Sequence, residues 1–186
     1  MNRPEADATV LRHVPGTVRV IDQAGLGGKF HVRCVDSFGN VKWEDEAYNL
    51  VTNAGLNNVL DAYIRAQTQT TTWYMGLVDN SGFTAFAGAD TSASHTGWTE
   101  NQNYSNANRP TWAPGAASSQ SITNSSTVNF NMTATATIKG LFIIANNTIG
   151  GTTGLLFSEA AFSGGTQSVN NGDTLQCTYT LSLATN

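Results

Sequence analysis

Three carboxylates flank a segment that is rich in aromatic residues: Asp79, Asp90 and Glu100. Glycoside hydrolases use two carboxylates that face each other across a cleft, about 5 to 10 Å apart. Asp79 opens the sequence DNSG and Asp90 lies in GADTS, and both sequences are typical of turns held by an Asp side chain. The sequence has no nucleophile elbow, Gly-rich phosphate loop or Cys–His pair. We therefore predict a non-enzymatic protein, with a polysaccharide-degrading enzyme as an alternative.

Metal binding is not favoured by the spacing of the histidines or of the acidic residues. The histidines are His13, His31 and His95, with no second His or Cys at the spacing of a zinc site. Residues 43–46, WEDE, supply three adjacent carboxylates that suit Ca²⁺. A strand would point Glu44 and Glu46 away from Asp45, which favours a solvated strand edge. No metal ion or other cofactor is predicted.

Aromatic residues of the segment after Asp79 have two interpretations. Trp98, Tyr104 and Trp112 are spaced for a shared platform on which sugar rings stack. Alternatively, the three rings plug one end of a β core, where large aromatic side chains bury the most area. We favour the plug, because it would explain an ordered long loop. Arg109 is predicted to hold this loop by stacking or by pairing with Glu100.

The composition excludes several classes of partner. Charged residues make up only 12% of the chain, the net charge is −4, and the sequence has three lysines. Nucleic-acid binding needs clustered basic side chains, so no nucleic-acid partner is expected. No apolar run approaches the roughly 18 residues that span a bilayer, and the N-terminal sequence lacks the apolar region of a secretory signal. We expect no membrane partner and a protein made and kept in a cytoplasm.

Both cysteines lie on the apolar side of an alternating run. Cys34 belongs to KFHVRCVD and Cys177 to DTLQCTYTLSL. This placement predicts buried free thiols in a reducing compartment, with a mutual disulfide as the alternative.

A clean alternation from residue 128 to 138 gives a strand two different faces. Val128, Phe130 and Met132 begin the apolar face. The opposite face carries uncharged amides and hydroxyls: Asn129, Asn131, Thr133 and Thr135. Such side chains form many hydrogen bonds without the desolvation cost of buried charge, so we interpret this face as a contact surface.

The helices and strands that position these residues are predicted from the hydrophobic periodicity of the sequence and from its turn residues. Alternating runs predict strands at 16–22 and 29–36, joined by a Gly-rich connection at 23–28. Spacing of Leu56, Val59, Leu60, Tyr63 and Ile64 predicts one apolar face of a helix at about 53–67, with Thr52 or Asn53 as its N-cap.

Strands fill most of the rest of the chain. A buried strand is expected at 70–79, and further strands are expected after residue 117. The aperiodic aromatic loop spans about 80–116, and residues 1–15 form an extended N-terminal arm. The expected fold of residues 16–186 is mainly β, an antiparallel β-sandwich or jelly-roll-like domain with one α-helix.

Several motifs, in order, resemble those of small virion structural proteins of tailed bacteriophages. The motifs are NLVTNAGLNNVLDAYI, TWYMGLVD, ADTSASHTGWTE, YSNANRPTW and NGDTLQ, and the similarity covers about residues 30–186. The resemblance implies a virion component, either a capsid decoration protein or a fibre-like part. It supplies no catalytic residues.

Our leading hypothesis is a capsid decoration or cement protein that clamps neighbouring capsid subunits. The expected partners are the major capsid protein and further copies of this chain, as a homotrimer, in a virion assembled in the host cytoplasm. The expected interface joins the contact surface to the arm, and its residues are Arg3, Val10, Leu11, Arg12, Asn129, Asn131, Thr133 and Thr135. The alternative is a tail-fibre or receptor-binding module that holds host glycans on Trp98, Tyr104 and Trp112.

Overall fold

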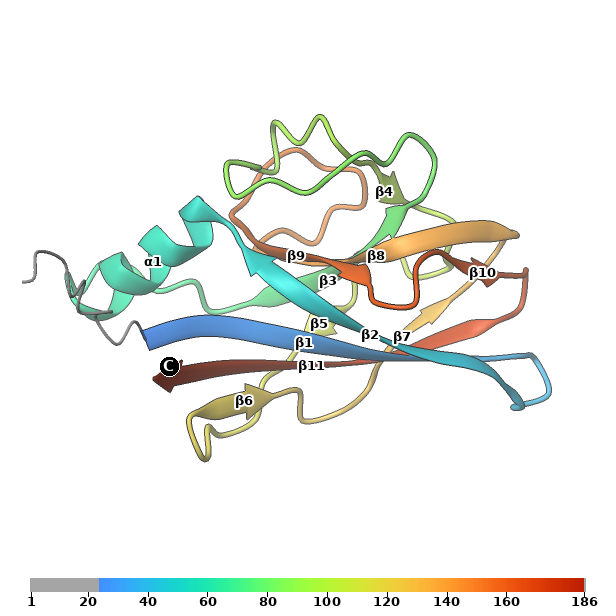
Figure 1. The fold of residues 1–186 in the computed structure, drawn as a ribbon, viewed down its shortest axis with the longest axis horizontal. Helices are drawn as coiled ribbons and strands as arrows, with labels where there is room; N and C mark the ends of the chain where they lie inside the picture. The colour runs from blue at the N-terminus through green and yellow to red at the C-terminus, as the bar shows by residue number, and fades with distance from the viewer. Residues whose placement is uncertain (1–23, 186) are drawn as a thin grey trace, which may run out of the picture.

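The computed structural model describes residues 24–185, which form a mainly β fold, as predicted (Figure 1). The predicted arm at 1–15 and the predicted strand at 16–22 lie outside the described residues. The elements are β1 (Ala24–Val35), β2 (Val41–Val51), α1 (Asn53–Tyr63), β3 (Trp73–Asp79), β4 (Glu100–Asn101), β5 (Thr111–Trp112), β6 (Ser121–Thr123), β7 (Val128–Asn131), β8 (Ala136–Ile144), β9 (Leu156–Phe162), β10 (Gln167–Val169) and β11 (Thr174–Thr185).

The strands form one antiparallel sheet that folds into two packed layers. Its order is β4-β3-β8-β9-β2-β1-β11-β6, with β7, β10 and β5 paired to β11, β8 and β3. Pairing of β2 with β9 joins the layer of β2, β1 and β11 to the layer of β9, β8 and β3. Apolar side chains of both layers fill a common core, among them Phe30 and Phe130 from one layer and Leu141 and Met75 from the other. The result is a sandwich-like arrangement.

The alternation from residue 128 to 138 is confirmed, but the predicted single strand is wrong. Odd-numbered residues are exposed throughout this stretch, and Val128, Phe130 and Ile138 are buried. The chain leaves the first layer after β7 and joins the second layer in β8. At this corner Met132 bonds to Asp173 and Gly172, and the Thr133 N–H donates to Asn103 O. A segment that passes from one layer to the other keeps the alternation of buried and exposed side chains, but it no longer forms hydrogen bonds to the same neighbouring strand.

The Gly-rich connection predicted at 23–28 is wrong, because Ala24–Gly28 forms the first part of β1. These residues pair with Leu181–Thr185 of β11. Glycine is suited here for a packing reason. The buried ring of Tyr179 lies against Gly28, and a Cβ on Gly28 would lie 2.6 Å from the Tyr179 hydroxyl.

Gly28→Ala is expected to lower the free energy of unfolding by about 1–3 kcal/mol, because the added methyl overpacks the core. Tyr179 has little freedom to move, since it stacks on Phe30 at 4.3 Å and accepts a hydrogen bond from Asn49 Nδ2 at 2.7 Å. Gly27→Ala is the matched control: a Cβ at Gly27 meets nothing within 4 Å. Urea denaturation of both variants checks the prediction, and equal stabilities would contradict it.

The helix begins where predicted and ends early. Thr52 is the N-cap, and its hydroxyl accepts a hydrogen bond from the Gly55 N–H at 3.0 Å. α1 ends at Tyr63 rather than at residue 67, because the next turn closes differently. The Arg65 N–H donates to Leu60 O, and Ala66 has a left-handed φ of 52°. No glycine in the sequence marks this end.

Candidate functional site

The three candidate catalytic carboxylates lie in separate structural contacts. Asp79 accepts hydrogen bonds from Ser81 N and from Asn101 Nδ2. Asp90 accepts from Ala87 N at 3.2 Å and from Trp98 Nε1 at 3.1 Å. The hydrogen bonds from Ser81 N and Ala87 N are turn contacts of the kind predicted for Asp79 and Asp90, and the other two fix the loop to neighbouring side chains.

Glu100 forms the predicted ion pair with Arg109, and the pair is buried. Arg109 Nε and Nη2 donate to the two Glu100 oxygens at 2.8 Å each, and both side chains are less than 7% exposed. The remaining guanidinium donors reach Asn146 O at 3.0 Å and Gly151 O at 3.2 Å. The pair therefore fastens the aromatic loop to the β8–β9 connection.

A second buried acidic group, Glu159 of β9, was not predicted from the sequence. Glu159 is fully buried, and its Oε1 accepts a hydrogen bond from the Ala87 N–H at 3.1 Å. The same N–H also donates to Asp90, so the two carboxyl groups share one donor. Burial, and then the charge of neighbouring Asp90, raise the pKa of Glu159 to about 8. The available signal was a lone acidic residue in an otherwise uncharged run, LLFSEAAF.

The aromatic platform, the less favoured interpretation, does not form, because its three rings are buried in two separate clusters. Trp98 is 4% exposed and packs with Phe142 on the outer side of the β3–β8–β9 layer. Tyr104 and Trp112 are each 5% exposed and belong to the main core. The rings fill space, as the favoured plug interpretation expected, but at two places rather than at one end of the core.

The acidic run of β2 alternates as predicted. Asp45 accepts hydrogen bonds from Gly164 N and Gln167 Nε2, while Glu44 and Glu46 pair with cations of β1. Within residues 24–185, no group of three or more His, Cys, Asp or Glu side chains is arranged to hold a metal ion.

Cys34 and Cys177 are buried free thiols, as predicted. Cys34 lies opposite Leu175, and Cys177 lies opposite Val32. Burial, and then the charge of Asp173, raise the pKa of the Cys34 thiol to about 12. Thiolate chemistry is therefore disfavoured at this position.

Uncharged side chains of β7 form part of a larger surface. Both β7 and β6 pair with β11, so Asn129 lies beside Gln176 and Thr123 lies beside Thr180. We call this surface the polar face, and its residues are Ser121, Thr123, Asn129, Asn131, Thr174, Gln176, Thr178, Thr180 and Ser182. Hydrogen bonds such as Ser121–Ser182 at 2.7 Å and Thr174–Asn131 at 3.1 Å orient its side chains.

The predicted interface residues divide into three groups. Asn129 and Asn131 belong to the polar face. Thr133 and Thr135 are exposed at the corner between β7 and β8. The predicted arm contacts lie outside the described residues: Arg3, Val10, Leu11 and Arg12.

Charged side chains border the polar face on β1 and β2. Lys29 pairs with Glu46 at 2.7 Å, and Arg33 pairs with Glu44 at 3.2 Å. These half-exposed pairs contribute little stability. Within each pair the positive and negative charges cancel, so the border of the polar face has no net charge of one sign.

A groove runs along the glycine-rich part of β1, on the same side of the sheet. It encloses about 480 Å³, and its floor includes Gly25 and Gly27. Its walls include Tyr48 of β2 and Thr180 and Ser182 of β11. We call it the glycine groove. The sequence does not indicate this groove, because a Gly-rich stretch between two alternating runs is typical of a connection.

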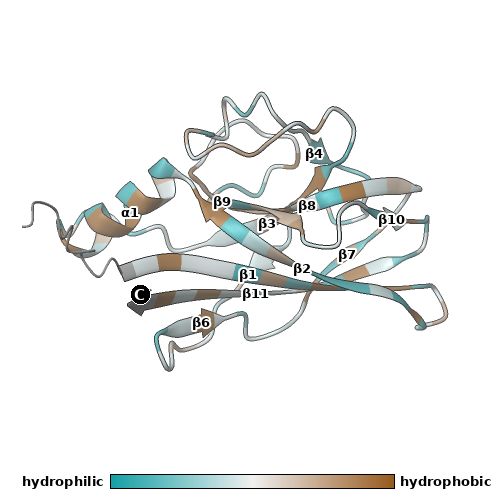
Figure 2. Ribbon diagram, viewed as in Figure 1, coloured by the Kyte–Doolittle hydropathy of each residue, from teal (hydrophilic) through white to brown (hydrophobic). Residues whose placement is uncertain are grey.

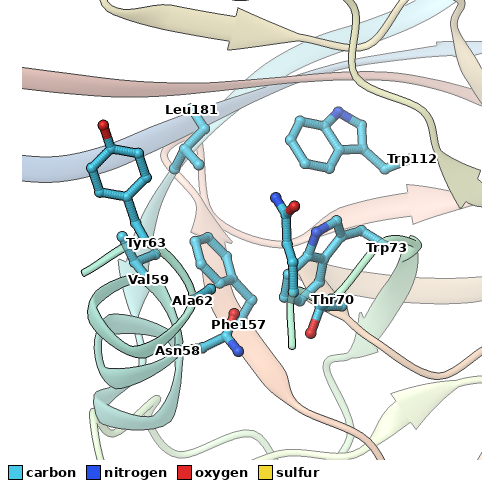
Figure 3. Close-up of a pocket in the computed structure, with 10 residues that line it drawn as sticks. Asn58, Val59, Ala62, Tyr63, Thr70, Trp73, Trp112, Phe157 and Leu181 are labelled. Carbon is cyan, nitrogen blue, oxygen red and sulfur yellow. The ribbon is translucent and has the colours of Figure 1, made fainter. Parts of the chain in front are cut away.

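An apolar pocket of about 270 Å³ opens between α1 and the sheet (Figure 3). We call it the end pocket. Trp73, Trp112, Phe157 and Leu181 form its apolar walls, and Tyr63 stands at its side on α1. The buried Nε1 of Trp112 finds no hydrogen-bond partner within residues 24–185.

Fold and surface together define a mainly β protein with a sandwich-like core and two accessible surfaces of uncharged residues, the polar face and the end pocket. No model of a known protein family matches the chain, and no curated protein matches it. In the described part of the chain, none of the helical structure has the length and apolar character needed to cross a bilayer.

Proposed function

We propose that this protein is a non-enzymatic structural protein of a tailed-phage virion, a capsid decoration protein that binds neighbouring capsid subunits. The observation that carries the proposal is the polar face, where strands distant in the sequence join uncharged amide and hydroxyl side chains into one surface. The sequence motifs described above support the virion setting.

A surface of this kind suits repeated contact with identical subunits. A stable interface buries about 800 Å² on each partner and contains roughly ten hydrogen bonds. Hydroxyl and amide groups supply such bonds, and no ionised group must be desolvated. The glycine groove adds a recess beside the face, into which a partner's strand or side chain can pack.

The arm and self-association complete the proposal. Residues 1–15 make a second contact on a neighbouring subunit, so that two weak contacts act together. Copies of the chain associate as a closed trimer. Structural use of Asp79, Asp90 and Glu100 supports a role without catalysis.

Gly27→Glu is expected to abolish binding to undecorated capsids without unfolding the protein. The new side chain projects into the glycine groove, and its Cβ meets no atom within 4 Å. It also places a further carboxylate in the groove, beside Lys29, which is already paired with Glu46, and burying an additional charge in an interface typically costs several kcal/mol. Cosedimentation with capsids measures occupancy, and circular dichroism checks the fold.

One charge substitution on each layer gives a matched pair of variants. Thr178 belongs to the polar face, so Thr178→Glu is expected to reduce the occupancy of capsid sites. Thr137 lies on β8 in the other layer, so Thr137→Glu is expected to leave that occupancy unchanged. Deletion of residues 1–15 tests the arm separately. Full occupancy by Gly27→Glu and Thr178→Glu would refute the proposed face, and full occupancy after the deletion would refute the clamp.

A further inference from the structure

The apolar face of α1 is exposed, although an amphipathic helix normally buries such a face. Leu60 is 58% exposed, Ile64 70% and Tyr63 85%. Leu56 is also exposed, and the spacing of three or four residues from Leu56 to Leu60 and from Leu60 to Tyr63 and Ile64 places all four on one side of the helix segment. We call them the α1 face. Figure 2 shows hydrophobic bands on α1, which lies at one end of the molecule; Val59 of this helix packs against the common core.

The end pocket lies directly beside the α1 face. Tyr63 belongs to both, since it lines the pocket and projects into solvent. Val59 and Ala62 carry the helix surface from Tyr63 into the pocket. One continuous surface therefore carries a protruding aromatic side chain and an apolar recess.

The charge of this surface permits contact with an identical surface. None of the ten residues that line the end pocket is charged. Asp61 and Arg65 of the helix segment form an ion pair at 2.8 Å and cancel each other. A surface with a net charge would repel its own copy, and this one has no such penalty.

We infer that the α1 face and the end pocket bind a second copy of this chain, with Tyr63 of one copy entering the end pocket of the other. The inference rests on the self-association in the proposed function, and it names the surface. In a closed trimer each copy offers a protrusion to one neighbour and a recess to the other, and the α1 face and the end pocket supply these two parts. An aromatic anchor in an apolar pocket is the usual centre of such an interface.

Association is tested on the full chain by light scattering and sedimentation over a range of concentrations. The wild type is expected to form a closed oligomer, and Leu60→Glu with Ile64→Glu is expected to weaken its association about tenfold or more. Phe38→Glu is the matched control, because Phe38 is 87% exposed in the β1–β2 turn, away from α1. It is expected to associate as the wild type does.

Filling the recess separates binding from folding. Ala62→Phe places a ring in the end pocket and is expected to weaken association while leaving thermal unfolding unchanged or raised, because it fills an existing cavity. A wild type that stays monomeric would overturn both the inference and the proposed self-association. Normal association of the Leu60 and Ile64 double variant would overturn the inference alone.

A separate measurement tests whether residues 1–23 occupy the α1 face instead of a second copy. If the wild type is monomeric and deletion of residues 1–23 raises the fluorescence of the apolar probe ANS, the segment 1–23 covers the α1 face and the inference is overturned.

Discussion

Arg109→Met lowers the free energy of unfolding by about 3–5 kcal/mol, the expected cost of leaving a buried charge without its partner. Glu100 would keep its hydrogen bonds from Gly150 N and Tyr104 Oη, at 2.6 and 3.3 Å, and lose both from the guanidinium. The carbonyls of Asn146 and Gly151 would lose their donors as well. Urea denaturation measures the loss.

The same substitution at an exposed pair is the control for Arg109. Arg65→Met removes the solvent-exposed pair with Asp61 and is expected to cost about 0.3–0.5 kcal/mol. Adding Glu100→Gln to Arg109→Met is expected to restore part of the stability, because the remaining group is then neutral. If Arg109→Met costs no more than Arg65→Met, the buried pair does not hold the loop as described.

Stability is expected to fall as pH rises from about 4.5 to 8, because of Glu159. The folded protein keeps the Glu159 proton up to a pKa of about 8, whereas the ordinary pKa of a glutamate is 4.5. Folding therefore binds a proton between these values, and the slope reaches about 1.4 kcal/mol per pH unit. The contribution is fully present below pH 4.5 and is lost as pH rises through the folded pKa.

Glu159→Gln tests this assignment, since glutamine keeps the shape and stays neutral. The variant is expected to lose most of the pH dependence and to exceed the wild type in stability at alkaline pH. Asp61→Asn removes an exposed carboxylate and is expected to leave the dependence as it is. Thermal unfolding across this pH range gives the comparison, and an unchanged slope in Glu159→Gln would assign the effect to another group.

Local periodicity and side-chain chemistry predicted much of this fold. Burial alternates through β7 and through residues 174–180 of β11 as the sequence indicates, because the period of a strand depends only on its own backbone. Thr52 caps the helix, and Arg109 pairs with Glu100, because each of these contacts lies between residues close in the sequence. The two thiols are buried for the same periodic reason.

What the sequence did not predict depends on contacts between distant residues. Gly28 lies in a strand because it pairs with Leu181 of β11, and glycine suits this position because the Tyr179 ring packs against it; both partners are about 150 positions away in the sequence. Glu159 meets Asp90 only after the aromatic loop folds over β9. The helix carries an apolar face in sequence, but whether that face meets the core depends on where the chain enters the sheet.

Pairing of β1 with β11 has a mechanical consequence. Ala24 lies opposite Thr185, so the two strands begin and end at the same edge of the molecule (Figure 1). A force that draws these two ends apart breaks the bonds between the strands one after another, at low load. A force that pulls on Ala24 while β11 adheres to a surface acts along β1 and loads all twelve residue pairs together. Tension from the N-terminal side is thus resisted best when the protein is attached.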